Sequence, residues 1–223
     1  MNAYQNKLFG EKETKIKNNK TIISVGYNQH EIIQDILDLH CNGKNIDCDP
    51  TYSIGNFYKH KIQKPKYCFD INPQKPLVIQ ASADKLPLEN DSIEVLMFDP
   101  PFVCGVDKKS TSTGIIRSRF SSFKNVPELL KFYESAVVEF SRILKVDGIL
   151  IFKCQDTVDG GKNYMIHRDV VNMAIKNEFK IKDLFILLKQ FRIIDPNIKK
   201  QYHARKFHSY FLVFKKLKKG KEK

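Results

Sequence analysis

The tetrapeptide Asp99-Pro100-Pro101-Phe102 combines residue types that can do chemistry, and it directly follows the apolar run at residues 95–98. Four consecutive apolar residues predict a strand buried on both faces, and two prolines allow neither helix nor further sheet where it ends. The carboxylate and the aromatic ring are therefore expected at the carboxyl end of a strand. Ligands bind at that edge in open α/β sheets.

Three more aspartates follow short predicted strands in order along the chain. Asp49 opens the segment Asp49-Pro50-Thr51-Tyr52-Ser53-Ile54-Gly55, Asp70 follows residues 67–69, and Asp84 follows residues 77–80. Aspartate is common in turns and at helix starts, so each of the three can be structural.

The elements that must position these residues alternate between strand and helix. The spacing of apolar residues predicts helices at 29–40, from about 127 to 145 and at about 165–177. Asp147-Gly148 is expected to turn the chain after the second helix. Strands are expected at residues 21–25, 45–48, 67–69, 77–80, 93–98, 149–154, 181–188 and 210–214.

This alternation predicts an α/β domain with a mostly parallel, three-layer sheet. No helical segment separates the last two strands, so they should pair as a long hairpin that makes the final strand antiparallel. Residues 21–216 are expected to form one domain between a flexible polar tail at 1–20 and a lysine-rich tail at 217–223.

The charge of the chain points to a polyanionic partner. Its 223 residues carry a formal net charge of +13, with a pI near 9.4. Nucleic acid is the default partner for such a field, ahead of an anionic membrane and of plain solubility. The five cysteines form no C-x-x-C pair, so neither a zinc site nor a disulfide framework is supported. The polar first residues and the lack of a long apolar run predict a cytoplasmic protein without a membrane partner.

Taken together, these features resemble the S-adenosylmethionine-dependent methyltransferases, whose seven-stranded sheet ends in an antiparallel hairpin. More narrowly, the chain looks like the amino-methyltransferases that act on adenine N6 or cytosine N4 of nucleic acids. Their signature after the fourth strand is Asp, Ser or Asn followed by Pro-Pro and an aromatic residue, and Asp99-Pro100-Pro101-Phe102 matches it. The resemblance implies a Rossmann-like methyltransferase fold over residues 21–216.

The resemblance also implies S-adenosyl-L-methionine as cofactor. The family's loop after the first strand reads Asp-Pro-Phe-x-Gly-x-Gly, and here Ser53 replaces the first glycine. That departure leaves open a reduced affinity or a loop of altered shape. The family places an acid for the ribose hydroxyls at Asp70 and adenine contacts at Ala83-Asp84. The implied cofactor-binding residues are Asp49, Tyr52, Ser53, Gly55, Asp70, Ala83 and Asp84.

The implied catalytic group is the tetrapeptide itself. An exocyclic amino nitrogen is a poor nucleophile, because its lone pair is delocalised into the ring. Two acceptors, the Asp99 carboxylate and the Pro100 carbonyl, can draw it towards tetrahedral geometry, while Pro101 stiffens the loop. Phe102 is expected to stack on the base, a contact worth about 1–3 kcal/mol. Methylation of cytosine carbon-5 instead needs a cysteine where Phe102 stands.

Two segments interleave cations with aromatic residues, as binding of single strands or flipped bases requires. Simple solvated loops are the alternative for both. The predicted nucleic-acid-binding residues are Lys108, Lys109, Arg117, Arg119 and Lys124 in the first segment, and Arg192, Lys199, Lys200, Arg205 and Lys206 in the second.

The sequence thus predicts a nucleic-acid amino-methyltransferase, with DNA adenine N6 favoured. No segment is long enough for a separate target-recognition domain, which predicts short or relaxed sequence specificity, with a specificity subunit or a homodimer as further alternatives. The other candidate functions are an RNA adenine N6 enzyme, a DNA cytosine N4 enzyme and an inactive nucleic-acid-binding protein of the same fold. Protein-glutamine methylation is disfavoured by Asp99 and by the positive charge, and a dinucleotide-dependent oxidoreductase by the lack of G-x-G-x-x-G.

Overall fold

The computed structural model describes residues 21–59, 62–102, 104, 123–190 and 200–220. The predicted amino-terminal tail, most of the loop after the tetrapeptide and part of the second basic segment lie outside these residues. No helix within the described ranges is long and apolar enough to cross a membrane.

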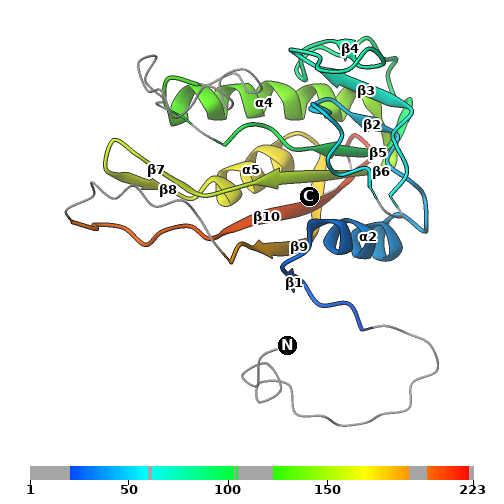
Figure 1. The fold of residues 1–223 in the computed structure, drawn as a ribbon. Coiled ribbons are helices and arrows are strands. Elements are labelled where there is room, and N and C mark those ends of the chain that lie inside the picture. Colours follow the sequence, from blue (N-terminus) through cyan, green and yellow to red (C-terminus); the bar gives the residue numbers. More distant parts are fainter. Residues whose placement is uncertain (1–20, 60–61, 103, 105–122, 191–199, 221–223) are drawn as a thin grey trace.

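One sheet of eight strands organises the described residues (Figure 1). Its order is β1-β9-β10-β6-β5-β2-β3-β4. The strands are β1 (Val25–Gly26), β2 (Cys48–Asp49), β3 (Tyr67–Asp70), β4 (Ile79–Gln80), β5 (Ile93–Phe98), β6 (Leu144–Cys154), β9 (Phe179–Leu188) and β10 (His208–Lys216).

The sheet is parallel except for its last strand. β10 runs antiparallel to both β6 and β9, and the other described pairings in this sheet are parallel. The predicted mostly parallel sheet with an antiparallel final strand is therefore confirmed. The two-residue strand β1 adds an eighth strand beside the seven that the methyltransferase resemblance implied, and it pairs with β9.

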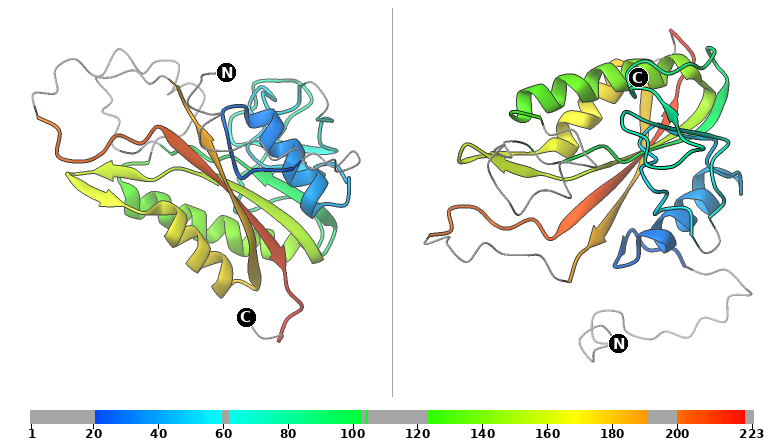
Figure 2. Two further views of the ribbon diagram at one scale, coloured as in Figure 1. Left: turned by 90° about the horizontal axis from the view of Figure 1, so that it is seen from below. Right: turned by 45° about the horizontal axis from the view of Figure 1, so that its top comes forward.

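Helices cover both faces of the sheet and make the three predicted layers (Figure 2). α2 (Gln29–His40) has the bounds predicted from its apolar spacing, and the Asn28 side chain caps it by accepting a hydrogen bond from the His30 N–H. α4 (Val126–Ile143) and α5 (Ile166–Lys176) lie on the opposite face. The Asn125 side chain caps α4 and Pro127 stands in its first turn, where a missing N–H costs nothing.

The apolar run before the tetrapeptide is the central strand β5, and it is buried on both faces as predicted. Val95 and Met97 pack into the core beneath α2, whereas Leu96 and Phe98 pack into the core beneath α4 and α5. The Phe98 ring contacts other aromatic rings edge to face, with its centroid 4.8 Å from that of Phe140 and 4.9 Å from that of Phe152. The residue after β5 is therefore anchored by a rigid strand.

Two details differ from the sequence-based expectation. The predicted turn at Asp147-Gly148 is an irregularity inside β6, where Ile93 and Val95 of β5 pair with Leu144 and Ile149. The structure also contains a hairpin that was not predicted, formed by β7 (Thr157–Asp159) and β8 (Lys162–Tyr164). Gly160 and Gly161 join its strands with φ of 55° and 75°, which two-residue turns of this kind require.

Candidate active site

A pocket of about 230 Å³ opens at the carboxyl ends of β2, β3 and β5. Five of the predicted site residues line it: Ser53, Asp70, Ala83, Asp99 and Pro101. Six further lining residues were not predicted as site residues, namely Pro50, Thr51, Ile71, Ser82, Phe123 and Phe132. Asp49, Tyr52, Gly55, Asp84, Pro100 and Phe102 are not among the lining residues, and Asp84 is exposed. Chain segments that are far apart in sequence thus meet at the edge where ligands bind in open α/β sheets.

Asp70 ends β3 with its carboxylate at this pocket. Its Oδ2 accepts a hydrogen bond from the Ser53 N–H at 2.9 Å, and its Oδ1 accepts one from the Asn72 N–H at 2.8 Å. Burial raises the pKa of this carboxyl group, and the two N–H donors oppose that effect. Each oxygen keeps a lone pair for one more donor. A ligand with two neighbouring hydroxyl groups could donate one hydrogen bond to each of these oxygens.

Ser53 has a backbone conformation that favours glycine. Its φ is +50°, in the left-handed region that favours glycine. The loop therefore has a bend at Ser53 that glycine adopts freely, and the Ser53 N–H points to Asp70.

Gly55 is required by a neighbouring ring. Its φ is +76°, and a Cβ at this position would collide with the Tyr52 hydroxyl oxygen. The Tyr52 ring in turn stacks on Tyr58, with centroids 5.3 Å apart and an angle of 7° between the planes. The glycine lets these aromatic side chains pack against the loop.

Asp49 does not line the pocket, and its side chain instead bonds to residues of the loop that follows β2. Its side chain is fully buried, and it accepts hydrogen bonds from the Thr51 N–H at 2.8 Å, the Thr51 hydroxyl at 3.0 Å and the Tyr58 hydroxyl at 2.7 Å. Burial raises its pKa to about 7, against the opposing effect of these donors. The Thr51 hydroxyl also accepts the Asp99 N–H at 2.9 Å, so Asp49 fixes the start of the tetrapeptide through Thr51.

Asp99 has one carboxylate oxygen that makes no hydrogen bond with the described residues, although the Lys153 ammonium lies 3.3 Å from it. Its Oδ1 is buried and has no hydrogen-bond partner in the described part of the chain, whereas its side chain as a whole is 24% exposed. Burial raises the pKa of this carboxyl group, and the charge of Lys153 opposes the rise. A buried acceptor without a donor is uncommon in native proteins and calls for an explanation.

Lys153 is a site residue that the sequence analysis missed. Its Nζ lies 3.3 Å from Oδ1 and 3.4 Å from Oδ2 of Asp99. The same ammonium lies over three phenylalanine rings, at 4.8 Å from the centroid of Phe57, 5.5 Å from that of Phe211 and 5.7 Å from that of Phe102. The sequence does contain an indication of this role, because Lys153 is a single cation inside the apolar strand at residues 149–154 and a buried lysine needs a partner of opposite charge.

The remaining residues of the tetrapeptide are held by α4 and β6. The Tyr133 hydroxyl, on α4, donates to the Pro101 carbonyl at 3.0 Å, which fixes the loop after β5. The Phe102 ring faces the Lys153 ammonium and is half-buried. Phe123 and Phe132 pack at 5.3 Å between centroids and line the pocket from the side of α4.

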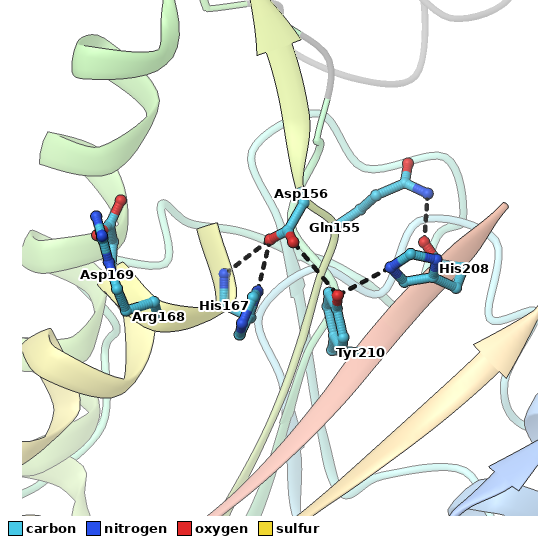
Figure 3. A network of polar contacts seen from close by, with 7 residues as sticks. All are labelled: Gln155, Asp156, His167, Arg168, Asp169, His208 and Tyr210. Carbon is cyan, nitrogen blue, oxygen red and sulfur yellow. Dashed lines mark hydrogen bonds and ion pairs between the residues drawn. The ribbon is translucent and has the colours of Figure 1, made fainter. Parts of the chain in front are cut away.

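A second polar network lies beyond the carboxyl end of β6 (Figure 3). Buried Asp156 accepts from the His167 N–H, contacts His167 Nδ1 at 2.7 Å and accepts the Tyr210 hydroxyl at 3.3 Å. His208 Nε2 lies 2.8 Å from that hydroxyl oxygen, and the Gln155 amide donates to the His208 carbonyl. Because Asp156 receives an N–H group from the first turn of α5, it serves as a remote cap for that helix. None of these residues was predicted from the sequence.

Four of the ten predicted nucleic-acid-binding residues belong to the described ranges: Lys124, Lys200, Arg205 and Lys206. Lys124 and Lys200 are exposed, and the Lys200 ammonium lies 5.0 Å from the ring centroid of Tyr202, which is 77% exposed. Lys108, Lys109, Arg117, Arg119, Arg192 and Lys199 lie outside the described residues.

The cysteines do not form a metal site in the described ranges. Cys41, Cys48, Cys68 and Cys154 are buried free thiols, and Cys104 is half-buried. No group of three or more His, Cys, Asp or Glu side chains there is arranged to hold a metal ion.

Comparisons with known proteins find similar structures. Neither a protein-family model nor a curated protein matches the chain. A candidate DNA modification methylase from Thermus thermophilus shares 16% identity and a TM-score of 0.42, over 64% of this chain and 53% of its own. The cytosine-N4-specific PvuII DNA methyltransferase shares 16% identity and a TM-score of 0.41, over 58% of this chain and 44% of its own. A candidate type 11 methyltransferase from Sulfolobus solfataricus shares 16% identity and a TM-score of 0.45, over 86% and 95% of the two chains.

The chain therefore spans about half the length of the first two of these proteins. Similarities at these identities and TM-scores carry no argument about this protein, and the fold is given by the strand order and strand directions of the sheet.

Proposed function

We propose that this protein is an S-adenosylmethionine-dependent methyltransferase that modifies an exocyclic amino group of a nucleic-acid base, with adenine N6 in DNA as the favoured target. The observation that carries the proposal is the buried Oδ1 of Asp99, which makes no hydrogen bond with the described residues beyond its ion pair with Lys153, on a residue that lines a pocket at the carboxyl edge of the sheet. An amino hydrogen of a base is a suitable donor.

The geometry around Asp99 suits the activation of an amino nitrogen. A carboxylate is an acceptor only, and the Pro100 carbonyl, next in the chain, supplies a second acceptor for the other amino hydrogen. Thr51 and Tyr133 hold this loop at Asp99 and Pro101, so both acceptors are positioned before the substrate arrives. Phe102 supplies a ring for stacking the base.

The residues on the other side of the pocket suit the cofactor. Asp70 has free lone pairs for the two ribose hydroxyls, and Ala83, Ile71 and Phe132 supply apolar surface for an adenine ring. When bound, S-adenosyl-L-methionine supplies a methyl group on a sulfonium. The candidate methylase from Thermus thermophilus has also been solved in complex with S-adenosyl-L-methionine.

The charge of the chain supports a nucleic-acid substrate. The net charge of +13 provides sequence-independent attraction to phosphates. The exposed pair of Lys200 and Tyr202 combines a phosphate contact with a stacking surface. Contacts of these two kinds hold the polymer without reading its sequence, so short or relaxed sequence specificity is part of the proposal.

Transfer of a labelled methyl group from the cofactor to DNA and RNA pools tests the proposal. Wild-type protein should label nucleic acid, and Asp99→Ala should abolish the labelling while the protein remains folded. Mass spectrometry of digested products then identifies the base and the sugar together. A wild-type protein that labels neither DNA nor RNA would sink the proposal, and 4-methylcytosine as the product would replace adenine as the target.

A further inference from the structure

Lys153 has no described role in binding the substrate or the cofactor, yet its charge is buried beside Asp99. The Lys153 side chain is 10% exposed, and burial of an ammonium is strongly unfavourable unless its charge is compensated. We propose that Lys153, held by three phenylalanine rings, is a positioning residue that keeps the Asp99 carboxylate ionised and fixed for a substrate amino group. The inference rests on the proposed function and assigns a residue to the same site.

The register of the sheet brings the two residues together. Phe98 at the end of β5 pairs with Phe152 of β6, so the next residues, Asp99 and Lys153, lie side by side. The ammonium is nearly equidistant from the two carboxylate oxygens, at 3.3 and 3.4 Å. These distances are longer than those of a strong charge-assisted hydrogen bond. The pair is therefore close enough to interact strongly by charge while the carboxylate still accepts further donors.

Three aromatic rings stabilise the Lys153 ammonium in place of water. Phe57, Phe102 and Phe211 come from the loop after β2, the tetrapeptide and β10, and their centroids lie 4.8 to 5.7 Å from the ammonium. Ring faces attract cations, and the attraction increases when the pair is removed from water. The rings thus compensate part of the desolvation of Lys153 and limit its movement to the side of Asp99.

Other charged and titratable groups around Asp99 come from β2, α4 and the end of β9. The charge of Lys189, after β9, also lowers the pKa of Asp99, but it contributes less than the charge of Lys153. Asp49, from β2, is a nearby carboxyl group of the same sign. Tyr133, from α4, directs its hydroxyl to the Pro101 carbonyl. Lys153 is therefore the principal opposite charge among the described residues.

Ionisation of Asp99 decides what it can do. A carboxylate offers lone pairs on both oxygens, whereas the protonated acid carries a hydrogen that repels an approaching amino hydrogen. Burial favours the protonated acid, and the adjacent cation favours the carboxylate. Removal of the cation should therefore raise the pKa of Asp99. A larger fraction of the molecules would then carry the protonated acid, which is a donor, at neutral pH.

A titration of Asp99 in the free, full-length protein tests the inference without any assay of activity. The carboxyl carbon of Asp99 is followed by NMR against pH and assigned with Asp99→Asn. Lys153→Met should raise the pKa of Asp99 by about one unit or more, and Lys153→Arg should keep it close to the wild-type value. Lys66→Met is a matched control, because Lys66 also lies over a ring, 4.8 Å from the centroid of Tyr67, but next to the amino end of β3. It should leave the titration unchanged.

The pH profile of methyl transfer gives the second readout. Lys153→Met should move the acidic limb to higher pH by the same amount as the NMR titration, with activity recovering as the pH rises. An unchanged Asp99 titration in Lys153→Met would overturn the inference, as would an equal loss of activity at every pH. If Lys153→Met does not fold, Lys153→Gln is measured in its place. Because the titration needs no substrate, it separates failure of this inference from failure of the proposed function.

Discussion

The hydroxyl of Thr51 accepts the backbone N–H of Asp99 at 2.9 Å and thereby joins the loop after β2 to the loop after β5. The same hydroxyl donates to the buried Asp49 carboxylate at 3.0 Å. One side chain thus connects a loop proposed to bind the cofactor with the acid proposed to bind the substrate. The alignment of the two halves of the site depends on it.

Thr51→Val should remove both hydrogen bonds of the hydroxyl, to Asp49 and to the Asp99 N–H, while keeping the shape of the side chain. The substitution leaves the Asp99 N–H and one lone pair of Asp49 without a partner, which should cost about 1–3 kcal/mol in the free energy of unfolding. Methyl transfer should fall by a larger factor than the stability loss explains, because Asp99 is no longer fixed. Urea unfolding and transfer assays measure the two effects. Thr157→Val, in the β7–β8 hairpin, is the matched control and should change neither by much.

Asp49 should give the protein an unusual dependence of stability on pH. Burial raises its folded-state pKa to about 7, above the ordinary 3.8, so the folded state binds the extra proton between these values. Stability contributed by this group is therefore highest below about pH 4 and is lost as the pH rises to about 7. Denaturant unfolding of wild type and Asp49→Asn across this range should show the wild type losing up to about 4 kcal/mol relative to the variant. A constant difference between the two proteins would contradict the assignment.

The sequence predicted the elements on which the site stands, because these depend on local patterns. The helix at residues 29–40 and the strand at residues 93–98 were predicted with their observed bounds, since apolar periodicity and the two prolines mark them clearly. The antiparallel final strand followed from the missing helix before it. The turn expected at Asp147-Gly148 lies inside β6, where residues 145–148 stand opposite the single residue Glu94 of β5, and this irregularity depends on the register of the two strands.

The side-chain partners could not be predicted, because they depend on register between strands far apart in sequence. Lys153 meets Asp99 only because Phe152 pairs with Phe98, and nothing local to residue 153 indicates that partner. The roles of Asp49 and Gly55 also required coordinates, since both act on neighbours inside the loop. The network around Asp156 joins residues up to 54 positions apart.

Asp156→Asn should destabilise the fold without altering Asp99. The substitution removes the negative charge of Asp156, whose oxygens contact the His167 N–H, His167 Nδ1 and the Tyr210 hydroxyl. It also replaces one of the two carboxylate oxygens by an NH2 group, which is a donor and faces one of these partners. We expect a loss of about 2–4 kcal/mol in the free energy of unfolding. Asp169→Asn is the control, since its partner Arg168 is exposed, and it should cost less than about 1 kcal/mol. An unchanged unfolding curve for Asp156→Asn would show that the network does not support the fold.

Ser53→Gly tests whether serine matters at a position where the methyltransferase loop that the sequence resembles has glycine. Ser53 has a φ of +50°, which costs an L-residue about 1–2 kcal/mol, whereas glycine adopts it freely. Glycine also makes the unfolded chain more flexible, which offsets about 0.4–1 kcal/mol of the gain. The net effect should be a stabilisation of up to about 1.6 kcal/mol. Ser53→Val should destabilise the protein, because a β-branched side chain is strained at positive φ. Thermal unfolding of the two variants measures this.

Calorimetric titration with S-adenosyl-L-methionine should give Ser53→Gly an affinity equal to or above that of the wild type, because the Ser53 N–H to Asp70 bond needs only the backbone. A weaker affinity would mean that the serine side chain itself takes part in binding.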